Sequence, residues 1–324
     1  MTLPVNPDVS LADPSGVRAW LGEQVARFVA SHDAKLTADT QERVRAELLR
    51  ADATDLGRLL QRMTNTGTDW EYQESDILAR RLSHALGRLV FEPGSALEGT
   101  DHLRIAERES VTFLVNHLSF ADANVLECFL AFAGFESVAG RLTVLVGPKV
   151  YTDPLRRLMS LCFGAIKTPQ SATLATGEAV MSKRAIATAA ASTLRHFEAR
   201  RAAGDHLLIF VEGSRSRTAS MQAALPAVSR YIENPDAVLV PVGLTGSEEL
   251  VPIGDERVHP TRVTATVGPP LRAAELWRHA NSKRRLLMDV VGLKIAALVP
   301  PSYRGVYGDA VGGLEEARAV AAEL

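Results

Sequence analysis

The chain has 324 residues, of which 46% are hydrophobic, and carries a formal net charge of -2 with an isoelectric point near 6.5. This length and apolar content are enough for one large core or two smaller units, and the near-neutral charge excludes a general attraction to nucleic acid. The two cysteines, Cys128 and Cys162, lie in apolar segments without zinc-site spacing, which is typical of a reducing compartment. No metal site is predicted.

The first 95 residues are expected to form a small helical bundle, predicted as a domain of its own (residues 1–95). Apolar side chains recur at helical spacing, with breaks at Pro14 and residues 66–68. Trp20 and Trp70 are interpreted as core residues of this bundle. The apolar positions are Val17, Leu21, Val25, Phe28 and Val29, then Val44, Leu48 and Leu49, then Leu56, Leu59, Leu60 and Met63, then Ile77, Leu78, Leu82, Leu86 and Leu89.

Residues 96–324 are predicted to form an α/β domain, because short apolar strands now alternate with helices. The expected architecture is a central mixed, largely parallel sheet flanked by helices and preceded by the small amino-terminal helical bundle. Strands are expected at residues 111–115, 142–146, 207–211, 238–242 and 262–267, and helices at residues 123–135, 153–161, 178–201 and 286–298.

A histidine and an aspartate bracket the turn between the first of these strands and its helix. His117 is followed five positions later by Asp122, a spacing that none of the other histidines has. Inside one helix the two side chains would lie about 140° apart, so they meet only if the turn folds back and places Asp122 in the first helical turn. The pattern indicates a catalytic base with its orienting carboxylate. The alternative is a hydrogen-bonded turn histidine and an aspartate that caps the helix.

A second polar loop, residues 212–217, follows another apolar strand. Its glycine, Gly213, allows a tight turn, and Arg215 and Arg217 stand at alternate positions, so they can close on one anion such as a phosphate. The alternative is a solvated loop in which both arginines pair with carboxylates. A serine hydrolase is excluded for Ser214 and Ser216, because the segment lacks the Gly-x-Ser-x-Gly elbow.

Together these loops resemble the conserved blocks of the glycerolipid acyltransferase (PlsC-like) family. Residues 116–122 match its Asn-His-x-x-x-x-Asp block, and residues 211–217 match its Glu-Gly-Thr-Arg-Ser-Arg block, with Ser214 where threonine is usual. Residues 240–243 and 299–307 look like its Val-Pro-Val block and its carboxyl-terminal tail. The match covers roughly residues 100–310 in the family's order. The helical start and residues 147–155 are similar to soluble, chloroplast-type glycerol-3-phosphate acyltransferases.

One block departs from the family pattern. Gln170 stands where the second block, residues 164–170, usually has an arginine, which affects acceptor binding. Lys167 is a candidate to supply the missing charge, as are Lys183 and Arg184. A solvated helical face is the alternative for the last two.

The resemblance implies an O-acyltransferase of phospholipid synthesis. It would move a fatty acyl group from acyl-CoA or acyl-ACP to a hydroxyl of glycerol 3-phosphate or its 1-acyl derivative, without a cofactor. In this interpretation His117 is the base, Asp122 orients it, and Arg215 and Arg217 hold the acceptor phosphate. Glu212 orients the loop that it begins. Asn116 and the amides near Gly213 and Ser214 are candidates to stabilise the oxyanion.

Three alternatives remain open from the sequence. The acceptor is glycerol 3-phosphate, or it is the 1-acyl form, or the chain is a catalytically silent lipid- or acyl-carrier-binding protein. An acyl groove is expected near Phe120, Leu126, Phe129 and Leu130, with core packing as the alternative. The basic run at residues 283–285 is expected either to touch anionic lipid headgroups or to be solvated.

Cytoplasmic localisation is expected, because the sequence shows no basic start followed by a hydrophobic stretch. The longest apolar segments, residues 125–135 and 290–300, contain Glu127 and Lys294 and fall short of the ~20 residues that span a bilayer. Membrane contact is therefore expected to be peripheral, at the inner face of the membrane.

Overall fold

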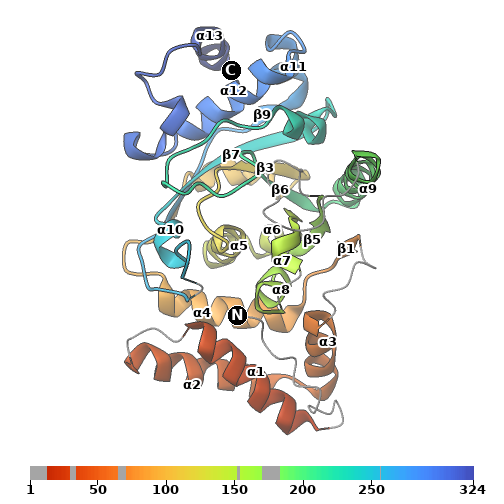
Figure 1. The fold of residues 1–324 in the computed structure, drawn as a ribbon, viewed down its shortest axis with the longest axis vertical. Helices are drawn as coiled ribbons and strands as arrows, with labels where there is room; N and C mark the ends of the chain where they lie inside the picture. The colour runs from red at the N-terminus through yellow and green to blue at the C-terminus, as the bar shows by residue number, and fades with distance from the viewer. Residues whose placement is uncertain (1–12, 30–33, 65–70, 152–153, 170–182, 256) are drawn as a thin grey trace.

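A computed structural model describes residues 13–29, 34–64, 71–151, 154–169, 183–255 and 257–324 (Figure 1). The strands are β1 (Tyr72–Gln73), β2 (Ala96–Glu98), β3 (Val111–Val115), β4 (Leu142–Val146), β5 (Gly164–Lys167), β6 (His206–Phe210), β7 (Val238–Thr245), β8 (Thr264–Val267) and β9 (Leu271–Arg272). The α-helices are α1 (Pro14–Val29), α2 (Ala34–Arg50), α3 (Ala53–Thr64), α4 (Ile77–Val90), α5 (Asp122–Phe132), α6 (Glu136–Gly140), α7 (Pro148–Tyr151), α8 (Pro154–Ser160), α9 (Lys183–Ala202), α10 (Ser247–Leu250), α11 (Ala273–His279), α12 (Arg284–Ala296) and α13 (Glu315–Glu323).

The strands form one mixed, largely parallel sheet in the order β1-β5-β4-β6-β3-β7-β8-β2, with β9 paired to β7. Strands β5, β4, β6, β3 and β7 run parallel, whereas β1, β8 and β9 are antiparallel to their neighbours β5 and β7. The α/β class and the sheet type predicted from the sequence are confirmed. Because parallel strands end at the same edge, the loops after β5, β6 and β3 share one rim of the sheet, which is where open α/β sheets bind ligands.

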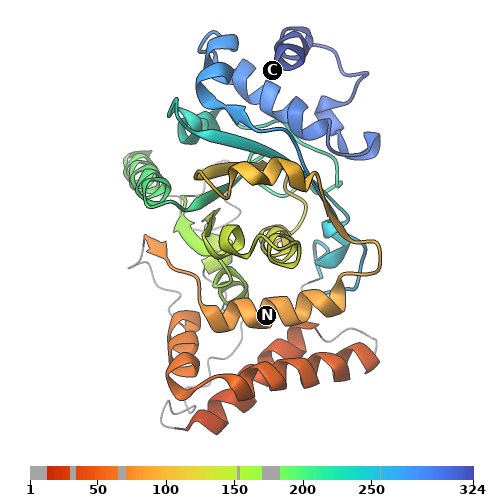
Figure 2. The same cartoon turned by 180° about the vertical axis from the view of Figure 1, so that it is seen from behind.

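Alternate side chains of the central strands pack into different cores. In β3, Phe113 and Val115 belong to the core on the side of α4 and α5, whereas Leu114 belongs to the core under α12. This alternation follows from the period of two in a strand. Figures 1 and 2 show the resulting layers, with α11 to α13 on one face of the sheet and α4 to α8 on the other.

All five predicted strands are present, within three residues of their expected ends. The sequence reasoning missed β5, β1, β2 and β9, because strands of two to four residues are too short to show a clear alternation. The predicted helices correspond to α5, α8, α9 and α12. Helix α9 is described from Lys183, so its expected start at residue 178 lies outside the described residues.

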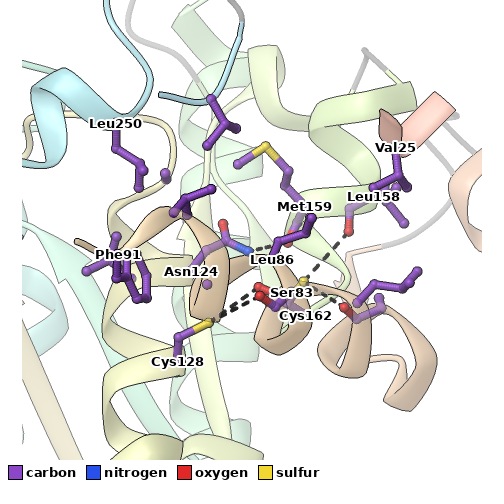
Figure 3. A pocket seen from close by; sticks show the side chains of 17 residues that line it. Val25, Ser83, Leu86, Phe91, Asn124, Cys128, Leu158, Met159, Cys162 and Leu250 are labelled. Atoms are coloured by element: carbon purple, nitrogen blue, oxygen red, sulfur yellow. Dashed lines mark hydrogen bonds between the residues drawn. The ribbon is translucent and has the colours of Figure 1, made fainter. Parts of the chain in front are cut away.

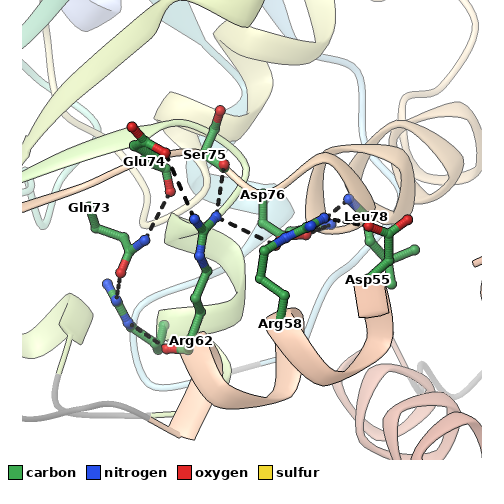
Figure 4. A network of polar contacts seen from close by, with 10 residues as sticks. Asp55, Arg58, Arg62, Gln73, Glu74, Ser75, Asp76 and Leu78 are labelled. Carbon is green, nitrogen blue, oxygen red and sulfur yellow. Dashed lines mark hydrogen bonds and ion pairs between the residues drawn. The ribbon is translucent and has the colours of Figure 1, made fainter. Parts of the chain in front are cut away.

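The amino-terminal region is helical, and the division of the chain at residue 95 remains a prediction. Trp20 packs against the larger core, and Trp70 lies outside the described residues. Asp76 caps α4 by accepting hydrogen bonds from the N–H groups of Leu78 and Ala79 (2.9 and 3.2 Å). Arg58 of α3 donates to the same carboxylate at 3.1 Å, as Figure 4 shows. This buried contact therefore fastens α3 to the start of α4.

Candidate active site

The two polar loops meet because β3 and β6 are parallel neighbours. Val115 is paired with Phe210, and His117 and Glu212 each follow two residues beyond that pair. The His117 N–H donates to Glu212 Oε1 (2.9 Å), and the Ser216 N–H donates to the His117 carbonyl (2.8 Å). The imidazole also stacks on the Phe210 ring, with centroids 3.9 Å apart. The second loop thus supports the first directly.

His117 and Asp122 lie in contact, as the folded-back turn requires. The distance from His117 Nδ1 to Asp122 Oδ2 is 2.8 Å, and Asp122 is the first residue of α5. The same carboxylate oxygen accepts the N–H groups of Leu118 and Ser119 (2.7 and 2.9 Å). A carboxylate accepts hydrogen bonds, so the ring proton sits on Nδ1 and the Nε2 lone pair is available to a substrate. This is the tautomer that a general base needs.

Asp122 and His117 differ in their exposure to solvent. The Asp122 side chain is fully buried, whereas 16% of the His117 side chain is exposed. The second oxygen of Asp122, Oδ1, accepts the hydroxyl of Ser247, which begins α10, at 2.6 Å. The carboxylate is therefore hydrogen-bonded on both oxygens and held rigidly. An imidazole held in this way faces solvent along one edge only.

Glu212 links backbone segments together. Its Oε1 accepts from His117, and its Oε2 accepts the N–H of Gln222 at 2.8 Å. Desolvation raises the pKa of this buried carboxyl to about 7, against the lowering effect of those two backbone hydrogen bonds. Glu212 thus joins the backbone of the first loop, at His117, to that of the second, at Gln222.

Gly213 has a conformation that suits glycine. Its φ is +67°, and a Cβ atom there would lie 2.3 Å from Leu225 Cδ1. Next along the loop, Ser214 and Arg215 are half-buried, Ser216 is buried, and Arg217 is exposed. A side chain at position 213 would therefore be strained and would clash with Leu225.

Two arginines contact the ring of Phe120, which stands between His117 and Asp122 in the first loop. The guanidinium carbon of Arg215 lies 3.5 Å from the ring centroid, and that of Arg156, from α8, lies 4.4 Å from it. These are cation–π contacts. Sequence reasoning did not single out Arg156, because an arginine on a short helix has no local signal of a site.

The other predicted residues lie away from this cluster. The Asn116 side chain is buried and bonded to the backbone of Leu244, donating to its carbonyl (3.0 Å) and accepting its N–H (2.7 Å). Lys167 ends β5, with its ammonium 4.9 Å from the Tyr151 ring centroid. Three strand spacings separate it from β3, roughly 14 Å. Arg184 is exposed on α9; Gln170 and the Lys183 side chain lie outside the described residues.

The carboxyl-terminal tail braces both loops, which sequence reasoning did not foresee. The Tyr303 hydroxyl accepts the N–H of Gly246 (3.2 Å) and donates to Glu248, on the turn that carries Ser247. The Tyr303 carbonyl accepts the N–H of Met221 (2.8 Å), beyond the arginine loop. Burial, together with Glu248, raises the pKa of Tyr303 to about 12, so its hydroxyl stays protonated. One residue thereby connects the supports of the two loops.

An apolar pocket is lined by residues at the start of α5, among them Asn124, together with residues of α4 and α8 (Figure 3). Its empty volume is about 660 Å³, a figure that includes open solvent at its mouth. It does not involve Leu126, Phe129 or Leu130, which are buried in the core, as the alternative interpretation expected. The pocket is lined by Val25, Ala79, Leu82, Ser83, Leu86, Gly87, Val90, Phe91, Ala121, Asn124, Val125, Cys128, Leu158, Met159, Cys162, Leu250 and Val258.

Three residues that could bind a metal ion include a carboxylate that is already paired with an arginine. Among the described residues, ligand atoms of His84, Glu127 and Cys128 lie within 4.8 Å of one another. The buried Glu127 carboxylate accepts hydrogen bonds from Arg80 and His84, each at 3.0 Å. The guanidinium opposes a second cation on the same carboxylate. Burial raises the pKa of Cys128, so its thiol stays protonated.

The basic run at residues 283–285 is paired with carboxylates. Lys283 contacts Glu316 (2.8 Å), Arg284 contacts Glu233 (2.6 Å), and Arg285 contacts Asp289 (2.8 Å). In the part of the chain that the structure describes, no helix is long and apolar enough to cross a bilayer.

Among comparisons with known proteins, only the structural one found a similar protein, and it concerns the fold. No protein-family model matches the chain, and no curated protein matches its sequence. Its structure is similar to the crystal structure of PlsC, the 1-acyl-sn-glycerophosphate (LPA) acyltransferase of Thermotoga maritima. The TM-score is 0.50 at 13% sequence identity, over 87% of this chain and 95% of that one. The chain therefore shares the fold of an acyltransferase.

Proposed function

We propose that this protein is an O-acyltransferase that moves a fatty acyl group from an acyl thioester, acyl-CoA or acyl-ACP, to a hydroxyl of glycerol 3-phosphate or 1-acylglycerol 3-phosphate. The observation that carries the proposal is the contact between His117 and the buried Asp122 at 2.8 Å, beside a loop that presents Arg215. The acyltransferase fold supports it.

The chemistry needs one base that later acts as an acid. His117 Nε2 takes the proton from the acceptor hydroxyl while that oxygen attacks the thioester carbonyl. The C–S bond then breaks, and the imidazolium returns the proton to the departing thiolate. Asp122 stabilises the imidazolium through Nδ1. Catalysis of this kind contributes roughly 10²- to 10⁴-fold, and positioning of the acceptor supplies much of the remainder.

Acceptor positioning is assigned to the arginine loop. Arg215 lies on Phe120, three residues beyond His117, so a phosphate held there keeps an attached hydroxyl near the imidazole. The oxyanion needs a separate donor. The Asn116 amide is bonded to Leu244 and the Gly213 N–H donates to Phe210 (3.1 Å), so we assign this role to the next amide, that of Ser214.

The acyl chain is assigned to the apolar pocket. Ala121 and Asn124, which line it, stand on either side of Asp122 in the sequence. A fatty chain in that pocket would remove apolar surface from water while the thioester stays at the rim. This arrangement fits acyl-CoA and acyl-ACP equally, since both carry the same thioester.

The test is to incubate the purified protein with acyl-CoA and each acceptor while free thiol is monitored. We expect thiol release that depends on one acceptor and is lost in the His117→Ala variant with the fold retained. Arg215→Ala is expected mainly to raise the KM for the acceptor. Binding of the protein to vesicles accompanies this activity if 1-acylglycerol 3-phosphate is the acceptor.

The competing function is a catalytically silent lipid- or acyl-carrier-binding protein with the same fold. It is favoured if neither acceptor releases thiol above background with acyl-CoA or with acyl-ACP. Thiol release that persists unchanged in His117→Ala contradicts the proposed mechanism.

A further inference from the structure

Arg156 approaches the candidate active site from outside both polar loops. It stands on α8, and its guanidinium contacts the same Phe120 ring as Arg215, at 4.4 and 3.5 Å from the centroid. The two guanidinium carbons are therefore within about 8 Å of each other. Both side chains are half-buried, so each is partly exposed to solvent.

This spacing suits one phosphate held by two arginines. In a hydrogen-bonded guanidinium–phosphate pair the N–O distance is about 2.8 Å, which places the phosphorus roughly 4 Å from each guanidinium carbon. Because both guanidinium groups contact one ring, a phosphate at the edge of the Phe120 ring lies within reach of both flexible side chains. Two guanidinium groups repel each other, and a bound phosphate dianion offsets that repulsion.

The orientation of Arg156 is set by its neighbour. Arg157 is fully buried and donates to Gln73 Oε1 (2.8 Å) and to the Arg62 carbonyl (3.2 Å). Consecutive residues of a helix point about 100° apart, so anchoring Arg157 in the amino-terminal bundle turns Arg156 away from it. Arg157 thus holds α8 in the rotation at which Arg156 meets Phe120.

We propose that Arg156 is a second phosphate-binding residue for the acceptor, acting together with Arg215. The inference rests on the proposed function for the identity of the acceptor. It assigns to α8 the charge for which Lys167, Lys183 and Arg184 were the sequence candidates. Lys167 lies on Tyr151, three strands from the histidine loop, and Arg184 is exposed on α9.

Binding of glycerol 3-phosphate and of inorganic phosphate, measured by calorimetry on the full chain, tests this inference without requiring turnover. Arg156→Gln is expected to weaken both at least tenfold, and Arg156→Lys, which keeps the charge, to recover part of the loss. The matched control is Arg88→Ala. Arg88 makes the same kind of contact, 4.5 Å from the centroid of Phe132, at the other end of α5, and its loss should leave both affinities unchanged.

Kinetics distinguish acceptor binding from other roles. In Arg156→Gln the KM for the acceptor should rise at least tenfold, with kcat and the KM for acyl-CoA within about threefold of the unmodified protein. A rise in the KM for acyl-CoA alone would assign Arg156 to the phosphates of the donor and overturn the inference. Unchanged affinity for glycerol 3-phosphate in a folded Arg156→Gln variant overturns it as well.

The experiments can refute the acyltransferase function and the role of Arg156 independently of each other. Absence of thiol release from the unmodified protein refutes the acyltransferase function, but the loss of glycerol 3-phosphate binding in Arg156→Gln still upholds a two-arginine phosphate site. If the unmodified protein releases thiol and Arg156→Gln matches it in every constant, only the role of Arg156 is refuted.

Discussion

The loops after β3 and after β6 lie side by side at the rim of the sheet, but they are built differently. The first is organised from within, because Asp122 binds His117, Leu118 and Ser119 of its own loop. The second is held from outside, through Glu212 to the first loop and through the tail at Tyr303. The first loop carries the proposed base, and the second carries the arginines. The proposed base thus stands on the loop with more hydrogen bonds of its own, and the substrate-binding charge on the loop that depends more on its neighbours.

The largest effects are expected in the first loop, where two substitutions should both lower kcat but differ in their effect on stability. His117→Ala and Asp122→Asn should each lower kcat by roughly 10²- to 10⁴-fold. Only Asp122→Asn should also destabilise the protein, by about 2–3 kcal/mol, because a neutral amide oxygen accepts weaker hydrogen bonds than a carboxylate does from the N–H groups of Leu118 and Ser119. Thiol-release kinetics and urea denaturation of both variants check this. Equal destabilisation by the two substitutions would contradict a loop organised by Asp122.

The second loop should be sensitive at its glycine. Gly213→Ala is expected to destabilise the protein by about 2–4 kcal/mol, because positive φ disfavours alanine and the new Cβ would meet Leu225 at 2.3 Å. Gly134→Ala is the matched control. It has a φ of +88° with nothing within 4 Å of the Cβ, so it should cost about 1 kcal/mol. Similar free energies of unfolding for the two variants would show that the contact with Leu225 is unimportant.

The junction between the loops should depend on pH. Burial raises the pKa of Glu212 to about 7 from 4.5, so the folded state binds a proton more tightly than the unfolded state does. The stability contributed by this group is therefore present below pH 4.5 and is lost as the pH rises through 7, by an amount on the order of 2–3 kcal/mol. Free energies of unfolding from pH 4 to 8 should show this loss in the unmodified protein and not in Glu212→Gln. Parallel pH profiles would contradict it.

The smallest effect is expected at the Ser247 hydroxyl, which supports Asp122 of the first loop from α10. Ser247→Ala removes the donor to Asp122 Oδ1 and should cost about 1–2 kcal/mol, with kcat reduced about tenfold or less. Ser247→Thr keeps a hydroxyl and is expected to restore most of the activity. If alanine and threonine behave alike in kcat and in the pH–rate profile, Ser247 does not position Asp122.

The longer strands of the sheet and the turn of the first loop could be predicted from local sequence patterns. Apolar runs of about five residues between polar segments, such as residues 111–115, predicted strands, and Asp122 is close enough in the chain for its geometry with His117 to be worked out from the helix period. The short strands β1, β2 and β9 escaped notice because two or three residues form a strand only when a neighbour supplies their hydrogen bonds.

The amino-acid sequence by itself determined the α/β alternation, the strand–turn–helix that joins His117 to Asp122, and the positions of the arginines after the next glycine turn. Only the tertiary structure decided which distant residues complete the site. Ser247 reaches Asp122 across 125 residues, and Arg156 reaches Phe120 from a separate helix. Such contacts have no period in the sequence, because they depend on which strands are neighbours in the sheet and how helices rotate against the core.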